Sequence, residues 1–366
     1  MSPLKIICHI TSVHPVKDVR IFYKECLSLA NAGYKVYFIA QHDNSEIIEG
    51  INIVRIPLIK NRLLRIFILP FIIVFKSIRI NASIYHFHDP ELLFVGFLLR
   101  LFNKKVIYDV HENVPEQILT KPYLNKLQKG IISRVFKFTE NAISRSFSGI
   151  ITSTPTIKER FININKNTID IKNYPVIEEI EPINWHEKKE RSLCYIGGIF
   201  EERGILENIR CLDESMKLLL AGTVSTPSFL EQIKSLPQWK FVNFVGYINR
   251  KEINTILNRS KIGLLTLHPF SSYIVSMPIK LFEYMAAGIP VIASNFELWR
   301  TIIEENNCGI CVDPLNIDEI KKAVNYLFDH EEIATQMGMN GRKLVLEKFN
   351  WKLEEKRLIE FYSTLI

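Results

Sequence analysis

Short apolar runs alternate along the chain with longer stretches whose apolar residues recur every three or four positions. In the first half the short runs, which predict buried strands, are Lys5–Ile10, Val36–Ala40, Ile51–Ile56, Ser83–His88, Lys105–Asp109 and Gly149–Thr152. In the second half they are Ser192–Ile196, Lys217–Ala221, Phe241–Phe244, Ile262–Leu265, Pro290–Ala293 and Gly309–Val312. Stretches between them, such as Ile21–Ala32 and Glu91–Phe102, have the spacing of amphipathic helices. This alternation predicts an α/β protein in which parallel sheets carry helices on both faces.

A break in the pattern divides the chain into two predicted domains. Asn173–Arg191 contains two prolines and many charges with little periodicity, as is typical of a linker. We therefore predict one Rossmann-like, doubly wound domain in residues 1–175 and a second in residues 176–350, followed by an amphipathic helix in residues 351–366. Because doubly wound sheets bind ligands beyond the carboxyl ends of their strands, we expect their crevices to face each other across one cleft.

The net charge of +7 is unevenly distributed. Residues 1–175 contain 24 Lys and Arg against 13 Asp and Glu, whereas residues 176–366 contain 22 against 26. A basic first half suggests an anionic partner. Nucleic acid is not expected, because this half lacks the aromatic-basic repeat that stacks on bases. The six cysteines have no framework spacing, the chain begins at once with a strand, and no apolar run is long enough to span a bilayer, so we expect a cytoplasmic protein.

The segment Met277–Ser294 predicts a helix that is joined to a buried strand through a glycine. Pro278 suits the first helical position, and Gly288 suits the left-handed residue that ends a helix. Glu283 is the single acid in this apolar helix, and no basic residue follows it one turn later. Because a buried carboxylate needs a partner, Glu283 either caps a neighbouring group, faces water or binds a ligand.

Two further segments place chemically useful residues after predicted strands. Tyr195–Gly204 runs from a strand into Gly197 and Gly198, and then toward a helix that begins near Arg203. Paired glycines let a ligand approach the backbone, and a helix amino terminus favours phosphate; a plain strand-to-helix turn is the equal alternative. Tyr108–Glu116, reading YDVHENVPE, ends another strand and predicts His111 and Glu112 at its carboxyl end.

These segments resemble motifs of glycosyltransferase family 4, most specifically YDVHE and KLFEYMAAGIPVIAS. The resemblance extends over nearly the whole chain, from the HPVKDVRIF loop at His14 to the tail from Trp351. It implies the GT-B architecture, with the C-terminal helix crossing back to the first domain. It also implies transfer of a sugar, with retention, from a UDP- or GDP-linked donor to an acceptor hydroxyl. Members generally work without metal and the chain has no D-x-D motif, so no metal cofactor is expected.

The resemblance assigns donor binding to six residues: Gly197, Gly198, Arg203, Tyr247, Lys280 and Glu283. Glu283 would hold the ribose hydroxyls, Arg203 the diphosphate, and Tyr247 would border the base. The chain departs from the family at two positions, where Gly198 replaces an arginine and Val275 replaces the first of two acids. Lys280 either restores the missing positive charge or is an exposed helix lysine.

On the acceptor side, the resemblance makes His111 and Glu112 the candidate catalytic residues, with His111 positioning the donor sugar. Lys17, Asp18 and Arg20 are candidates for binding the acceptor, although capping of the following helix is an equal role for Asp18. His86, His88 and Asp89 make a metal site conceivable, but no third ligand set has matching spacing.

Two segments that are both basic and apolar help to predict the kind of acceptor. Arg62–Arg79 and Asn125–Phe147 mix cations with apolar residues, so each is either a peripheral contact with an anionic membrane or a helix packed on the sheet. Together with the basic first half, they favour a lipid-linked acceptor, and by analogy a role in capsule, O-antigen or similar surface polysaccharide biosynthesis at the inner face of the membrane. A nucleotide-sugar epimerase of the same fold and a non-catalytic glycosyltransferase-like partner protein are the alternatives.

Overall fold

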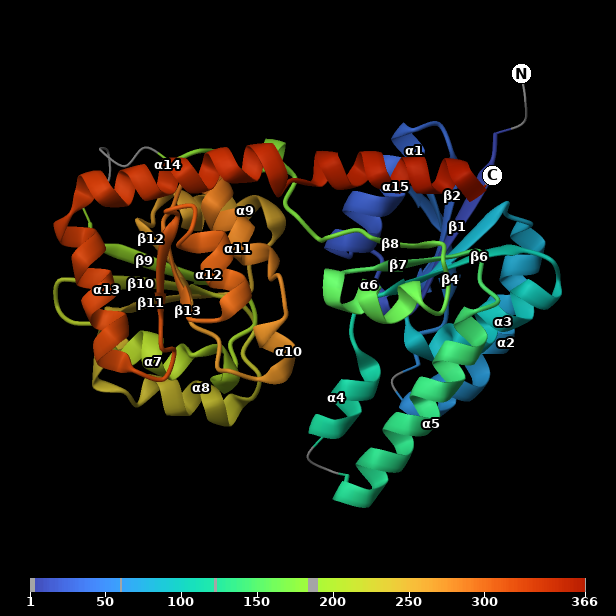
Figure 1. Cartoon of the computed structure of the whole chain (residues 1–366), viewed down its shortest axis with the longest axis horizontal. Helices are drawn as coiled ribbons and strands as arrows, with labels where there is room; N and C mark the ends of the chain where they lie inside the picture. The colour runs from blue at the N-terminus through green and yellow to red at the C-terminus, as the bar shows by residue number, and fades with distance from the viewer. Residues whose placement is uncertain (1–3, 60, 122–123, 184–189, 366) are drawn as a thin grey trace. The chain divides into compact units, whose positions relative to one another are not determined.

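The computed structural model describes residues 4–59, 61–121, 124–183 and 190–365 (Figure 1). The chain forms two compact units. The first contains the residues up to Asn173 together with those from Lys352 onward, and the second contains Tyr174–Trp351. Each unit has its own sheet and its own apolar core.

The first unit is built on an eight-stranded sheet in the order β3-β4-β2-β1-β5-β6-β7-β8, parallel except for β3. The strands are β1 Ile6–Pro15, β2 Lys35–Gln41, β3 Glu46–Ile48, β4 Ile51–Ile56, β5 Ile84–Phe87, β6 Lys105–Val110, β7 Gly149–Thr152 and β8 Thr168–Asp170. The helices are η1 Val19–Cys26, α1 Leu27–Asn31, α2 Arg62–Ile80, η2 Pro90–Leu92, α3 Leu93–Leu101, α4 Val114–Thr120, α5 Lys126–Ser144 and α6 Pro155–Ile162.

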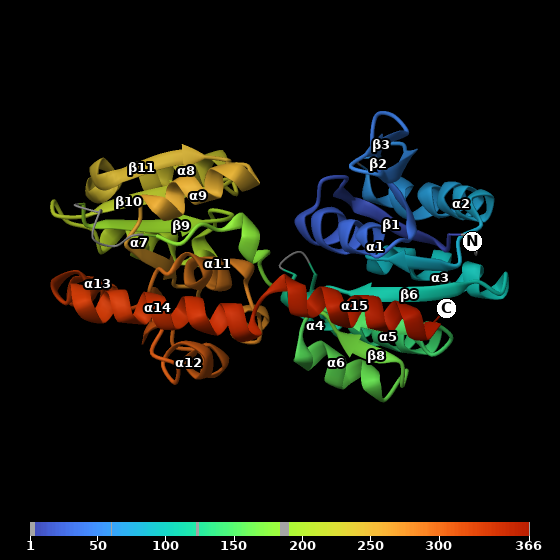
Figure 2. The ribbon, with the colours of Figure 1, turned by 90° about the horizontal axis from the view of Figure 1, so that it is seen from above.

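The C-terminal helix α15, Trp351–Leu365, packs on the sheet of the first unit, as predicted (Figure 2). The hydroxyl of Tyr362 lies 2.6 Å from Nδ1 of His86, and Arg357 donates to Asp170 at 2.9 Å. On the opposite face, α2, α3 and α5 contribute Leu69, Leu99 and Phe136 to one apolar cluster.

The second unit is a six-stranded, wholly parallel sheet in the order β11-β10-β9-β12-β13-β14. The strands are β9 Ser192–Ile196, β10 Lys217–Ala221, β11 Val242–Gly246, β12 Ile262–Leu265, β13 Val291–Ser294 and β14 Gly309–Val312. One face packs against α9 Arg250–Asn258, α11 Ile279–Ala287, α12 Glu297–Ile303 and α14 Glu331–Lys348. The other packs against α7 Ile205–Arg210, α8 Pro227–Lys234 and α13 Ile317–Asp329. The remaining helical turns are η3 Ile177–Glu179, η5 Glu201–Arg203, η6 Pro237–Phe241 and α10 Ser271–Ile274.

The predicted α/β class with two doubly wound, parallel-sheet domains is therefore confirmed. The two strands that the sequence pattern did not predict, β3 and β8, lie at the edges of the first sheet and have only three residues each. Three residues are too few for an alternating or an apolar run to stand out from a loop.

The helix of the Met277–Ser294 segment differs from its prediction at one end only. Helix α11 begins at Ile279, so Pro278 is the N-cap residue rather than the first helical one. At the other end Gly288 has φ +78°, and its amide hydrogen bonds back to Met285 and Tyr284, which confirms the left-handed helix end. This turn leads into the buried strand β13, so α11 lies against the sheet with all residues from Lys280 to Ala287 buried.

All six cysteines, including Cys308 and Cys311, are buried, and none of them forms a disulfide. Among the described residues, none of the helices combines the length and the apolar character that crossing a bilayer requires.

Candidate functional site

A buried ammonium group lies beside the glycine turn that follows β9. Lys280 is 7% exposed, and its Nζ lies 3.8 Å from the centre of the Tyr195 ring. A Cβ atom on Gly197 would lie 3.1 Å from this Nζ and 3.7 Å from Nη1 of Arg203. Within the described part of the chain, Nζ has no hydrogen-bond partner. The alternative of an exposed helix lysine is therefore wrong.

The electrostatics of Lys280 make this place a candidate anion site. Burial, and then the positive charge of Arg203, lower the pKa of Lys280 well below its usual value. Bringing an anion to the same place would offset both effects, because it would pair with both cations and favour the protonated form of Lys280. A group with two or more negative charges would therefore be stabilised beside Gly197.

The turn from Tyr195 to Gly204 is shaped by its glycines. Gly197 has φ +135°, a conformation that residues with a side chain rarely adopt. Arg203 ends the short helix η5 and stacks on Phe200, and Gly204 then turns the chain into α7. The helix expected to begin near Arg203 starts only at Ile205, because Gly204 adopts φ +68° against the backbone of Thr266. Arg203 thus acts through its side chain, not as part of a long helix terminus.

Glu283 has a partner that the sequence did not reveal. Its side chain is 4% exposed and is ion-paired with Arg250 of α9, which also pairs with Glu179 at 2.7 Å. The partner that no residue one turn later in α11 supplies is therefore Arg250. Local spacing missed Arg250 because it lies 33 residues away in sequence.

Of the other candidates in the second unit, Tyr247 follows β11 and is 80% exposed, free to stack on a flat ligand. Gly198 offers no charge, and its carbonyl accepts from the Tyr195 hydroxyl at 2.9 Å. Val275, where the family has an acid, ends α10 and is half-exposed.

In the first unit, His111 is held by a buried carboxylate. Its Nε2 lies 2.9 Å from Oδ2 of Asp109, which also bonds Nδ1 of His88 at 3.2 Å. Burial alone would raise the pKa of Asp109, but Arg20 and His111 hold it well below its usual range. Asp109 is therefore ionised, and it fixes the orientation of the His111 ring, which is 20% exposed.

His111 and Glu112 line a cavity of about 770 Å³ within the first unit. Its other polar lining residues include His14, Asp89 and Glu91, and its apolar lining comes mainly from α2, α4 and α5 through Ile66, Ile118, Ile132 and Phe136. A mainly apolar pocket with a few polar groups suits an amphiphilic ligand.

The three candidates of the amino-terminal loop have different positions. Lys17 is exposed. Asp18 caps η1 by accepting from the amides of Arg20 and Ile21, so the capping role is the one found. Arg20 is buried and bonds both oxygens of Asp109 at 3.1 and 3.2 Å. Its guanidinium is buried and paired with Asp109, so the expectation that Arg20 binds the acceptor does not fit the structure.

The structure does not bring together the three residues, His86, His88 and Asp89, that the sequence suggested as a metal site. Asp89 turns away from His86 and His88 and accepts hydrogen bonds from Thr11 and Ser12. The two histidines instead lie close to His9 and Glu25. Neither of these residues is near them in sequence, which is why spacing alone did not identify them.

Two doubly wound, parallel-sheet units of this kind are the architecture of the GT-B glycosyltransferases. Residues 19–171 match the family model "Glycosyltransferase Family 4", and residues 176–344 match "Glycosyl transferases group 1". The chain therefore belongs to the family 4 type of glycosyltransferases.

Similar proteins agree with this assignment. An uncharacterized glycosyltransferase of Methanocaldococcus jannaschii is 24% identical over 295 residues, covering 76% of this chain and 73% of that protein. The capsular polysaccharide biosynthesis glycosyltransferase CapM of Staphylococcus aureus is 22% identical over 237 residues, covering 62% and 61% of the two chains.

Solved structures show the same fold at low sequence identity. Sucrose-phosphate synthase from Thermosynechococcus elongatus superposes with a TM-score of 0.80 at 18% identity, covering 99% of each chain. HepE from Anabaena, in complex with UDP-glucose, superposes with a TM-score of 0.71 at 14% identity, covering 98% of this chain and 99% of that one.

Proposed function

We propose that the protein transfers a sugar, with retention of anomeric configuration, from a UDP- or GDP-linked donor to a hydroxyl of a lipid-linked acceptor during assembly of a surface polysaccharide. The observation that carries the proposal is Lys280, a buried ammonium beside Arg203 at the Gly197 turn. A diphosphate has the charge that this pair of cations needs.

The donor is held at three points. Lys280 and Arg203 bind the diphosphate, Glu283 accepts hydrogen bonds from the ribose hydroxyls while its ion pair with Arg250 holds it in place, and Tyr247 covers the base. The structure of HepE with UDP-glucose supports a donor of this class. Lys280 supplies the charge that is absent at Gly198, and no metal is needed at the diphosphate.

The chemical step breaks the bond between the anomeric carbon and the phosphate oxygen, and forms a bond from that carbon to the acceptor oxygen. Positive charge from Lys280 and Arg203 stabilises the departing diphosphate. The leaving phosphate takes the acceptor proton. His111, fixed by Asp109, hydrogen-bonds the donor sugar near its reacting carbon, and Glu112 lies beside it in sequence on the cavity lining.

The proposal of a lipid-linked acceptor is supported by the apolar cavity and by exposed residues on the surface of α2 and α5. On α2, Phe67, Phe71 and Phe75 are 69%, 67% and 56% exposed, and on α5 Leu127 and Phe138 are 73% and 77% exposed. The same helices bury Leu69 and Ile73, and partly bury Phe136, in the apolar core, so packing on the sheet occupies one face of each helix. An exposed apolar face with exposed cations such as Lys126, Arg134 and Lys137 suits an anionic membrane surface.

The capsular polysaccharide enzyme CapM supports a setting in surface polysaccharide synthesis, with the protein peripheral to the inner face of the membrane. In this setting the lipid of the acceptor enters the cavity from the bilayer, while its saccharide meets His111.

The test is release of UDP or GDP from a panel of nucleotide sugars, with and without polyprenyl-diphosphate saccharides. We expect one donor to react, faster with acceptor, and NMR of the product to show the donor's anomeric configuration. Lys280→Met should abolish turnover, whereas Lys322→Met, on the exposed side of α13, should not. Interconversion of the donor sugar without transfer would identify an epimerase, and donor binding without turnover would identify a non-catalytic partner.

A further inference from the structure

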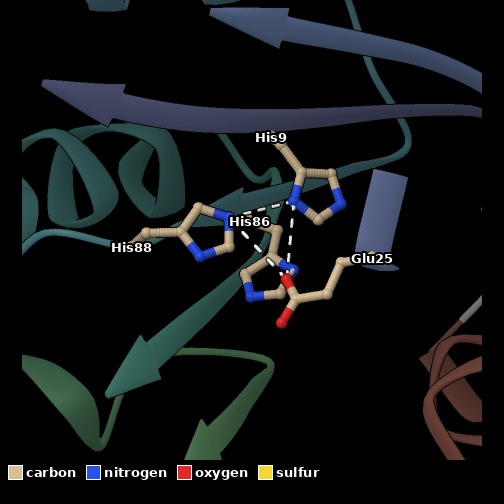
Figure 3. Close-up of side chains that lie close together, drawn as sticks. All are labelled: His9, Glu25, His86 and His88. Carbon is tan, nitrogen blue, oxygen red and sulfur yellow. Dashed lines mark hydrogen bonds and ion pairs between the residues drawn. The ribbon is translucent and has the colours of Figure 1, made fainter. Parts of the chain in front are cut away.

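Three histidines and a glutamate meet inside the first unit (Figure 3). His9 lies on β1 and is paired in register with His86 on β5. His88 follows β5 directly, and Glu25 comes from η1. All four side chains are at most 2% exposed. Four metal-binding groups from three segments thus converge where bulk water is excluded.

The ligand atoms of this cluster have the separations of a metal site. Nδ1 of His9 lies 2.9 Å from Nε2 of His88. Oε2 of Glu25 lies 3.9 Å from each of these nitrogens and 4.0 Å from Nδ1 of His86. Four ligand atoms about 2.0–2.1 Å from a tetrahedral zinc ion are roughly 3.3 Å apart. The observed separations lie on either side of that value, so small shifts would bring all four atoms onto one ion.

Two neighbouring residues orient the ligands. Nδ1 of His88 bonds Asp109 at 3.2 Å, so its Nε2 faces the cluster. Oε1 of Glu25 lies 3.0 Å from Nε of Arg20, so its Oε2 faces the histidines. A histidine that ligates a metal through one nitrogen commonly donates its other N–H to a carboxylate, as His88 does here.

The cluster is incomplete as a hydrogen-bonded network. Neither oxygen of Glu25 accepts a hydrogen bond from the described residues, and Nε2 of His86 has no hydrogen-bond partner among them. Arg20 and Asp109 face the cluster from outside, and Arg20 is ion-paired with the carboxylates of both Glu25 and Asp109.

We propose that His9, Glu25, His86 and His88 bind one Zn²⁺ ion in a structural site. Three imidazoles and one carboxylate are ligands that zinc accepts, and four protein ligands leave no open position for chemistry. The ion joins η1 to β1 and β5. Through His88 and Asp109 it also steadies His111.

Tyr362 defines the competing arrangement without metal. Its hydroxyl lies 2.6 Å from Nδ1 of His86 and 3.4 Å from Nε2 of His9. Without an ion, this hydroxyl donates to His86. With an ion, Nδ1 of His86 coordinates the metal, and the hydroxyl turns away. Tyr362→Phe therefore removes a donor that only the metal-free network needs.

The test is the zinc content of the full chain, purified with a histidine-free tag from zinc-supplemented cells and measured by plasma mass spectrometry. We expect one zinc per chain, unchanged in Tyr362→Phe and lost in Glu25→Gln. The control His42→Gln alters an exposed histidine that also pairs with a glutamate, and it should keep the metal. Removing zinc with a strong chelator should lower Tm, and returning one equivalent should restore it.

Folded protein that lacks zinc and takes none up would overturn the proposal, as would full zinc content in Glu25→Gln. Should Glu25→Gln fail to fold, the visible absorption spectrum of the wild-type chain loaded with Co²⁺ tests the four-ligand site instead. Intense visible bands of tetrahedral cobalt support the four-ligand site, and the pale spectrum of octahedral cobalt refutes it.

Discussion

Arg250 of α9 donates to the carboxylate of Glu283 on α11, and both side chains are largely withdrawn from solvent. The pair joins two helices on one face of the second sheet. It also gives the candidate ribose ligand a partner of opposite charge before any donor arrives.

Removing Arg250 should therefore destabilise the protein more than removing the pair. Arg250→Met leaves the Glu283 charge buried, and we expect a loss of about 3 kcal/mol in the free energy of unfolding. The double variant with Glu283→Gln should recover part of this loss, because it removes the unpaired charge. Urea unfolding of the two single variants and the double variant measures the coupling. Additive losses would mean that the two side chains do not interact.

Replacing Lys280, unlike replacing Arg250, should stabilise the folded protein while weakening its binding of the nucleotide. Replacing this unpaired, buried ammonium by the apolar Lys280→Met should raise the free energy of unfolding by about 1 kcal/mol at pH 7. The same change should weaken UDP or GDP binding about 10- to 100-fold, since it removes a charge-assisted contact. Thermal unfolding and titration calorimetry measure the two effects.

The pH dependence of this difference follows from the lowered pKa of Lys280. In the wild-type chain the unfolded state takes up a proton below about pH 10.4, whereas the folded state takes it up only at lower pH. The stability gained by Lys280→Met should therefore grow as pH falls from about 10 and level off below the folded-state pKa. A gain that is constant between pH 10 and 7 would contradict a lowered pKa.

Asp170 on β8 should give the first unit an acid-sensitive contact. It pairs with Lys158 at 3.0 Å and with Arg357 of α15 at 2.9 Å, and also with Lys172. Although burial opposes it, these cations hold the pKa of Asp170 below its usual value. Its contribution is present above about pH 3.9 and is lost as pH falls through the lower folded-state pKa.

Asp170→Asn should accordingly lower the free energy of unfolding by about 1–3 kcal/mol at pH 7 and by much less near pH 2. Chemical unfolding of the wild-type chain and the variant at the two pH values measures these losses in the free energy of unfolding. Asp329→Asn is a suitable control, because Asp329 is exposed and pairs with a single cation, Arg191. Equal losses for Asp170→Asn at both pH values would refute the assignment.

Membrane binding can be tested on the exposed apolar face of α2 and α5. Replacing Phe71 and Phe138 together by Glu should reduce flotation with anionic vesicles at least several-fold, because the variant loses apolar area and gains repulsive charge. Binding of the wild-type chain should weaken with salt. Leu346→Glu, an equally drastic change on an exposed position of α14, should have no effect. Absence of wild-type flotation at low salt would refute the membrane contact.

The strands and the Gly288 turn could be predicted because their signals are local. The short apolar run Ile262–Leu265 is a buried strand, as predicted, and the left-handed turn after α11 depends on the absence of a side chain at Gly288. The family motifs then directed attention to Glu283, Lys280 and His111. The sequence alone thus determined the fold class, the two sheets and most candidate site residues.

The tertiary structure decided which charges meet. Arg250 lies 33 residues from Glu283, and Arg20 lies 89 residues from Asp109, so no spacing rule connects them. The cluster of His9, Glu25, His86 and His88 exists only because β1 and β5 are neighbours in the sheet. Burial, which lowers the pKa of Lys280 and withdraws Arg20 from the surface, depends on what packs around a side chain. Local sequence therefore specified the elements, whereas long-range packing set the partners and charge states of the residues they carry.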